Sequence, residues 1–121
     1  MQATRILAIR HGETDWNVET RIQGHTDIPL NAQRLWQADQ VAQALKDESI
    51  AAVYASDLSR AMTTAQAIAH AHGLPIATHQ ALRERHLGHF QGKTWQDIET
   101  QHPHDASRWK QRLPEWTPAG G

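Results

Sequence analysis

The fold is decided by ILAIRHGETDWN, residues 6–17, in which an apolar run stops abruptly at Arg10-His11-Gly12. An apolar run bounded by a glycine is typical of a buried strand that leads into a loop, so we predict a first strand over residues 4–9. Arg10 and His11 then lie at the C-terminal tip of a strand, which is where open α/β folds bind ligands. The pair suits phosphoryl chemistry, because a guanidinium holds phosphate oxygens and an imidazole can attack phosphorus.

The composition of the chain excludes several classes of protein. At 121 residues it forms one domain at most, so we treat residues 1–121 as a single unit. A formal net charge of −1 argues against nucleic acid or a membrane surface as a partner. No cysteine is present, which excludes disulfides and thiolate chemistry. The N-terminal apolar run is too short for a signal segment or a transmembrane helix, so we predict a cytoplasmic protein.

Beyond residue 17, helical patterns alternate with short apolar runs. We predict two long helices, over residues 31–46 and 58–71, and two further strands, over residues 50–55 and 75–78. Two shorter helices should follow, over residues 94–101 and 105–112. Asn31 is the expected N-cap of the first helix, and Ser56-Asp57 that of the second. The polar loops 12–30 and 82–92 have the length of functional loops. Strands that alternate with helices predict an α/β fold with a parallel sheet.

Three segments of the chain bring charged side chains to one edge of this sheet. The first strand ends at Arg10 and His11. The second strand leads into the helix that carries Arg60, and the third leads into the loop that carries Glu84. A helix N-terminus at the same edge favours an anion. The residues alone also allow that Arg60 is a solvated helix charge and that Glu84 forms a surface ion pair with a neighbouring arginine.

Three motifs extend this pattern and resemble the signatures of the histidine phosphatase superfamily, which includes the cofactor-dependent phosphoglycerate mutases. The first motif is RHGET with Asn17, followed by residues 21–30. The second is SDLSRA at residues 56–61 with TTA at residues 63–65, and the third is LRERHLG at residues 82–88, followed by Gln91-Gly92. The resemblance covers about residues 5–94. It implies a three-layer α/β/α fold with a mostly parallel sheet, and residues 95–121 would then begin the substrate cap region.

The resemblance also implies roles for particular residues. His11 would be the nucleophile that becomes phosphohistidine, and Arg10 and Arg60 would bind the phosphoryl oxygens. Glu84 would donate a proton to the leaving oxygen. Three further residues would line the phosphate and substrate pocket: Asn17, Gln23 and Gly24. From the residues alone, hydrogen bonding within the loop explains Asn17 and Gln23 equally well.

Two departures from the family pattern stand out. Arg34 occupies a position in the first helix where many members have glycine, and we expect its side chain to be solvated. The family also uses a second catalytic histidine, normally far downstream at the end of another strand. No such histidine precedes Gly121, so we expect that this sequence is an N-terminal portion that lacks the C-terminal part of the domain.

The resemblance therefore implies phosphoryl transfer through a phosphohistidine, with hydrolysis of a small phosphorylated metabolite as the leading interpretation and no cofactor required. A phosphoglycerate mutase primed by 2,3-bisphosphoglycerate is the alternative, less favoured because residues 97–112 are short and hold no adjacent arginine pair. Two further alternatives remain. The chain could be an inactive phosphate-binding fragment, or it could be unstable alone because a sheet edge is left open.

The remaining histidines and tryptophans have simpler interpretations. His70 and His72 suit a helix C-terminus, and His102 lies in an expected turn. No histidine spacing resembles a metal motif, so we predict no metal site. We expect the tryptophans at 95, 109 and 116 to belong to a core, with the lining of a substrate cap as the alternative.

Overall fold

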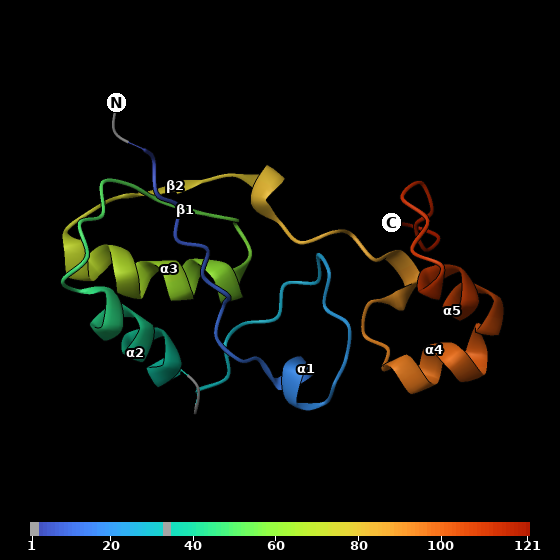
Figure 1. The fold of residues 1–121 in the computed structure, drawn as a ribbon. Helices are drawn as coiled ribbons and strands as arrows, with labels where there is room; N and C mark the ends of the chain where they lie inside the picture. Colours follow the sequence, from blue (N-terminus) through green and yellow to red (C-terminus); the bar gives the residue numbers. More distant parts are fainter. Residues whose placement is uncertain (1–2, 33–34) are drawn as a thin grey trace.

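A computed structural model describes residues 3–32 and 35–121 (Figure 1). The element order is α1 (Asp15–Val18), α2 (Leu35–Leu45), β1 (Val53–Ala55), α3 (Ser59–His72), β2 (Ile76–Thr78), two 3-10 turns, η2 (Gln80–Leu82) and η3 (Gly88–Phe90), and then α4 (Trp95–Gln101) and α5 (Pro103–Lys110). Arg34, expected to be solvated, lies outside the described residues. Residue 33, in the same predicted helix, lies outside them as well.

The parallel sheet predicted from the sequence is present. β1 and β2 pair in parallel, with Val53 opposite Ile76 and Ala55 opposite Thr78, and α3 makes the connection between them. Gly73 ends α3 in the left-handed conformation, with φ of 63°, and its N–H bonds back to the carbonyl of Ala69. This α/β unit confirms the predicted fold class.

α2 and α3 pack against each other and lie on the same side of the two strands (Figure 1). The apolar stripes predicted for these helices supply the buried side chains, which include Ala38 and Ala42 from α2 and Ala65, Ile68 and Ala69 from α3. Of the three layers expected, the described residues therefore form the sheet and one helical layer.

The strand predicted over residues 4–9 is wrong. Residues 3–10 have no regular secondary structure, and the described backbone gives them no ladder partner. Ile6 is 83% exposed and Ile9 is 42% exposed. An apolar run indicates burial, but a strand also requires a neighbouring backbone, and no local pattern supplies one.

The cap predicted for α3 is also wrong. The N-cap position is Leu58, which makes no side-chain capping bond. The N–H of Ser59 instead donates to Oδ1 of Asp27 at 2.7 Å. The start of α3 is thus capped by a carboxylate from the loop between α1 and α2.

A second packed group forms at the C-terminal side of the chain, where α4 and α5 pack on each other. Its core contains Phe90 and Ile98, both fully buried, and the tryptophans at 95, 109 and 116 pack against it. These tryptophans therefore pack on a core, as expected, and Trp109 and Trp116 also line a hollow. In the described part of the chain, none of the helices is long and apolar enough to cross a membrane.

Candidate active site

The loop that follows His11 is ordered by a fully buried threonine. Thr14 caps α1: its Oγ1 accepts from the N–H of Asn17 at 3.2 Å, and its own N–H donates to Oδ1 of Asn17 at 3.0 Å. The Thr14 hydroxyl donates to Oε1 of Gln23 at 2.6 Å. Asn17 and Gln23, both predicted site residues, are therefore fixed in place by hydrogen bonds inside the loop.

Two helices hold the backbone on the C-terminal side of His11. The N–H of Gly12 donates to Oγ1 of Thr64 on α3 at 3.0 Å, and the Thr64 hydroxyl donates in turn to the carbonyl of Arg60 at 2.8 Å. The N–H of Glu13 donates to Oε1 of Gln37 on α2 at 2.9 Å. The roles of Thr64 and Gln37 were missed by sequence reasoning, although Thr64 belongs to the second motif, because both side chains act on the backbone of a distant segment.

The tautomer of His11 follows from one contact. Its Nδ1 lies 2.5 Å from the carbonyl oxygen of Gly12. A carbonyl oxygen only accepts hydrogen bonds, so Nδ1 carries the proton and the lone pair of the neutral ring is on Nε2. The backbone thus fixes the ring in the form that a nucleophile requires.

The electrostatic surroundings also favour the neutral ring. Burial lowers the pKa of His11 from its ordinary value of 6.5, and the charges of Arg60 and Arg10 lower it further. The hydrogen bond to Gly12 and the charge of Glu84 act in the opposite direction. Because the net shift is downward, His11 is mostly neutral at pH 7.

Arg60 lies under the loop instead of at the surface. Its side chain is 2% exposed, which excludes the interpretation as a solvated helix charge. The guanidinium donates to the carbonyl of Gly24 at 2.6 Å and to that of Thr26 at 2.7 Å. Burial lowers the pKa of Arg60, and the charges of Glu84 and Asp27 counteract this effect.

Glu84 approaches the same group from the third motif. One of its carboxylate oxygens lies 3.6 Å from a guanidinium nitrogen of Arg60, and its side chain is 54% exposed. Its neighbour Arg83 instead forms two hydrogen bonds of 2.5 Å with Asp57. The surface ion pair that the sequence also allowed for Glu84 is therefore replaced by a contact with Arg60.

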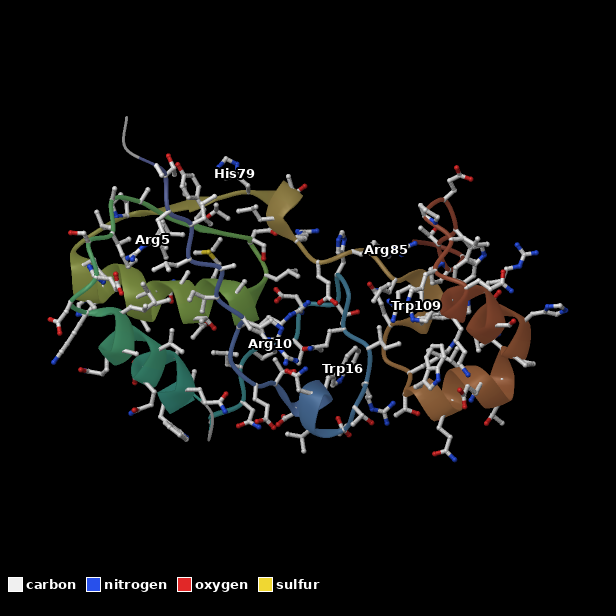
Figure 2. All side chains as sticks on the ribbon, in the orientation of Figure 1. Arg5, Arg10, Trp16, His79, Arg85 and Trp109 are labelled. Carbon is white, nitrogen blue, oxygen red and sulfur yellow. The ribbon has the colours of Figure 1, made fainter. Side chains whose placement is uncertain are left out.

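A hollow of about 370 Å³ opens beside His11. Its lining residues come from the signature loop and from α2: Arg10, His11, Glu13, Asn17 and Gln37. Figure 2 shows Arg10 near the middle of the molecule, between α3 and α1. Three of the predicted site residues line this hollow: Arg10, His11 and Asn17. Gln23 and Gly24 instead support the loop through hydrogen bonds. Arg60 and Glu84 act on His11 through their charges. The guanidinium at the hollow favours an anion over a metal ion as the occupant.

Comparisons with known proteins identify the family of the chain. The family model of the histidine phosphatase superfamily (branch 1) matches residues 6–121. The chain belongs to the histidine phosphatase superfamily. The match includes residues 95–121, where the three motifs give no resemblance.

Curated relatives of this superfamily have different names. The chain is 51% identical over 94 residues to phosphoglycerate mutase-like protein 4 of Arabidopsis thaliana, covering 76% of this chain and 41% of that protein. It is 36% identical over 121 residues to glucosyl-3-phosphoglycerate phosphatase of Mycobacterium tuberculosis, covering 100% of this chain and 54% of that protein. The chain thus spans about half the length of the curated relatives that it matches.

A solved structure supports the fold assignment. The mycobacterial glucosyl-3-phosphoglycerate phosphatase in complex with VO3 superposes with a TM-score of 0.81 at 35% identity, covering 89% of this chain and 51% of that chain. The histidine phosphatase fold is therefore the fold of this chain.

Proposed function

We propose that the protein hydrolyses phosphomonoesters of small metabolites through a phosphohistidine at His11. The observation that carries this proposal is the contact of His11 Nδ1 with the carbonyl of Gly12, which leaves the lone pair on Nε2. Arg10 lines the same hollow, and the charge of Arg60 also acts on the ring. Phosphoryl transfer depends mainly on such positioning and on cationic stabilisation of the phosphoryl oxygens.

The proposed reaction has two steps. The Nε2 lone pair of His11 forms a bond to phosphorus while the ester P–O bond breaks, and the electron pair of that bond leaves with the alcohol oxygen. Glu84 is the proposed donor of the proton that this oxygen takes up. A water molecule then attacks the phosphohistidine, Glu84 takes up a proton from the water, and inorganic phosphate leaves. The balance requires water as the only co-reactant.

A mutase is the second candidate, and it is supported by the name of the relative from Arabidopsis thaliana, which is 51% identical over 94 residues. In a mutase, 2,3-bisphosphoglycerate would prime His11 and the phosphoryl group would return to the substrate. We favour the phosphatase because a relative that aligns with the whole chain, from Mycobacterium tuberculosis, is named as one. A requirement for 2,3-bisphosphoglycerate in the activity assay would reverse this preference.

We also propose that residues 95–121 begin the substrate cap and that the protein works in the cytoplasm. A second hollow of about 320 Å³ in this region supports the first point. Arg85 and Trp109 of α5 both line it, with the guanidinium carbon 5.4 Å from the centre of the indole ring, and Figure 2 shows the two residues next to each other. This hollow offers cationic and aromatic groups to the part of a substrate that lies outside the phosphate site.

The proposed function is tested with p-nitrophenyl phosphate and orthovanadate. We expect hydrolysis of p-nitrophenyl phosphate, its loss in His11→Ala, and its retention in His104→Ala, since His104 is an exposed histidine on α5. Vanadate should raise the melting temperature, and Arg10→Ala should reduce this shift. If the vanadate shift depends on His11 and Arg10 but no ester is hydrolysed, the chain is a phosphate-binding module and the phosphatase proposal is wrong.

A further inference from the structure

Two histidines and an aspartate meet in the C-terminal group, away from the candidate active site. His89 comes from η3, His102 from the junction of α4 and α5, and Asp105 from the first turn of α5. One potential ligand atom of each lies within 4.8 Å of those of the other two. We propose that these three side chains form a binding site for a divalent transition-metal ion, with Zn²⁺ as the best match. This proposal is independent of the phosphatase proposal.

The donor set fits zinc. Imidazole nitrogen and carboxylate oxygen bind Zn²⁺ at about 2.0–2.2 Å, and three protein ligands with one water molecule make a common tetrahedral site. In such a site the ligand atoms are roughly 3.3 Å apart, so the side chains must close by only a small rotation from their present separation. Nε2 of His89 donates a hydrogen bond to Oδ2 of Asp105 at 2.8 Å, and the ion would take the place of this proton between the two ligand atoms.

The core beneath the cluster holds His89, which in turn contacts His102 and Asp105. The ring of His89 packs edge to face on Phe90, with 4.9 Å between the ring centres, and Phe90 is fully buried. The rings of His89 and His102 are likewise perpendicular, with their centres 4.6 Å apart. The side chains of His89 and Asp105 are 24% and 35% exposed. The cluster thus rests on the core through His89 and is partly open to an entering ion.

A lysine ammonium already lies at this cluster. Nζ of Lys93 is 3.4 Å from Nδ1 of His89 and 3.2 Å from Nε2 of His102. An ammonium only donates hydrogen bonds, so Nδ1 of His89 and Nε2 of His102 present their lone pairs to it. Binding of a metal ion at Nε2 of His89 therefore requires the ring proton to move to Nδ1 and the ammonium to leave. The long side chain of Lys93 allows its ammonium to withdraw into solvent. The ammonium and the metal ion therefore compete for the same two histidines, and this competition lowers the affinity for the metal.

A bound ion would connect η3 to the α4–α5 junction. Because an ion that binds only the folded chain stabilises that state, zinc should raise the melting temperature of the protein. Sequence reasoning predicted no metal site. The spacing of His89, His102 and Asp105 matches no metal motif, and the three residues meet only when α4 and α5 pack on η3.

The proposal is tested by titrating the metal-free 121-residue chain with Co²⁺, read by visible absorption, and with Zn²⁺, read by calorimetry. We expect one equivalent to bind. His102→Gln removes a ligand and should weaken binding by at least about tenfold, since even residues that only orient a ligand contribute about 10–100-fold. His104→Gln is the matched control, because His104 is exposed and lies close to the cluster in sequence without belonging to it. Its affinity should equal that of the parent chain.

Lys93→Met provides a test of opposite sign. Removing the competing positive charge should tighten Zn²⁺ binding by at least about tenfold, a result that misfolding cannot produce. Absence of cobalt absorption, equal affinity in His102→Gln and the parent chain, or no gain in Lys93→Met would each overturn the proposal. So would a loss of binding in His11→Gln, because the ion would then lie in the candidate active site.

Discussion

Arg60 shows how a single buried side chain can order a loop to which it does not belong. It lies on α3, yet its guanidinium donates to the carbonyls of Gly24 and Thr26 in the loop between α1 and α2. A buried guanidinium without partners would be strongly destabilising. The two carbonyls and the carboxylate of Glu84 compensate for its burial. Its charge therefore remains near His11, where an anionic substrate would need it.

His11 gives a pH-dependent prediction at this scale. Burial, followed by the charges of Arg60 and Arg10, lowers its pKa below 6.5 in the folded chain. The unfolded chain therefore takes up the proton first, and His11 causes a loss of stability as the pH falls from about 6.5 through the lower folded value. By NMR titration, the ring of His11 should change its chemical shift with a midpoint below 6.5.

His11→Gln serves as the reference for the stability effect, because it keeps a polar side chain but has no titration in this range. Between about pH 7 and about pH 5 the melting temperature of the parent chain should fall more steeply than that of His11→Gln. Parallel curves, or a midpoint at or above 6.5 in the NMR titration, would show that burial does not govern this ring.

Sequence reasoning placed several side chains of the hollow but not those that support it. Arg10, His11 and Asn17 belong to one motif and line the hollow together. Thr64 and Gln37 bond to the backbone of Gly12 and Glu13 from two separate helices. Such contacts depend on how the helices pack, and no spacing in the sequence encodes them.

At the scale of elements, the boundaries that were predictable are those set by neighbouring residues. α4 begins at the predicted position because Thr94 and Asp97 form a local capping box, with hydrogen bonds of 3.0 and 3.1 Å. α3 instead takes its cap from Asp27, which is 32 residues away from Ser59. The strand predicted over residues 4–9 failed for a related reason, since its pairing depends on a distant backbone.

The distant cap of α3 leads to a prediction at this scale. Asp27→Ala should lower the free energy of unfolding by about 0.5–2 kcal/mol, the usual contribution of an N-cap side chain. Asp27→Asn keeps the accepting oxygen and should recover most of this loss. Asp39→Ala, at an exposed position on α2, is the control and should change the free energy by less than about 0.5 kcal/mol. The measurement is urea denaturation. Equal effects of Asp27→Ala and Asp39→Ala would contradict the assignment of the cap.

At the scale of the whole molecule, the loop around α1 joins the two packed groups (Figure 1). On one side Arg60 and Thr64 of α3 hold this loop. On the other side Ile22 exchanges backbone hydrogen bonds of 3.0 and 2.7 Å with Lys93 and Gly92. The candidate active site therefore depends on both groups, although His11 and Arg10 belong to neither.

Gly24 lies where this connection is tightest. Its φ is 55°, and a Cβ atom there would lie 2.3 Å from Oε1 of Gln91. That oxygen accepts from the N–H of His25 at 2.7 Å and from that of Leu87 at 3.3 Å. A side chain at position 24 would thus displace the carboxamide that connects the loop to the third motif.

Gly24→Ala should therefore destabilise the chain more than Gly73→Ala does. Gly73 has a similar φ of 63° but no atom within 4 Å of its added Cβ, so its substitution costs only the backbone strain, about 1–2 kcal/mol. Gly24→Ala should cost about 1–3 kcal/mol more, because the N–H groups of His25 and Leu87 lose their acceptor. Urea denaturation measures both variants. In a Gln91→Ala background the two costs should become equal, since the displaced carboxamide is already absent. If the difference between the two glycines persists in that background, Gln91 is not the group that connects the loop to the third motif.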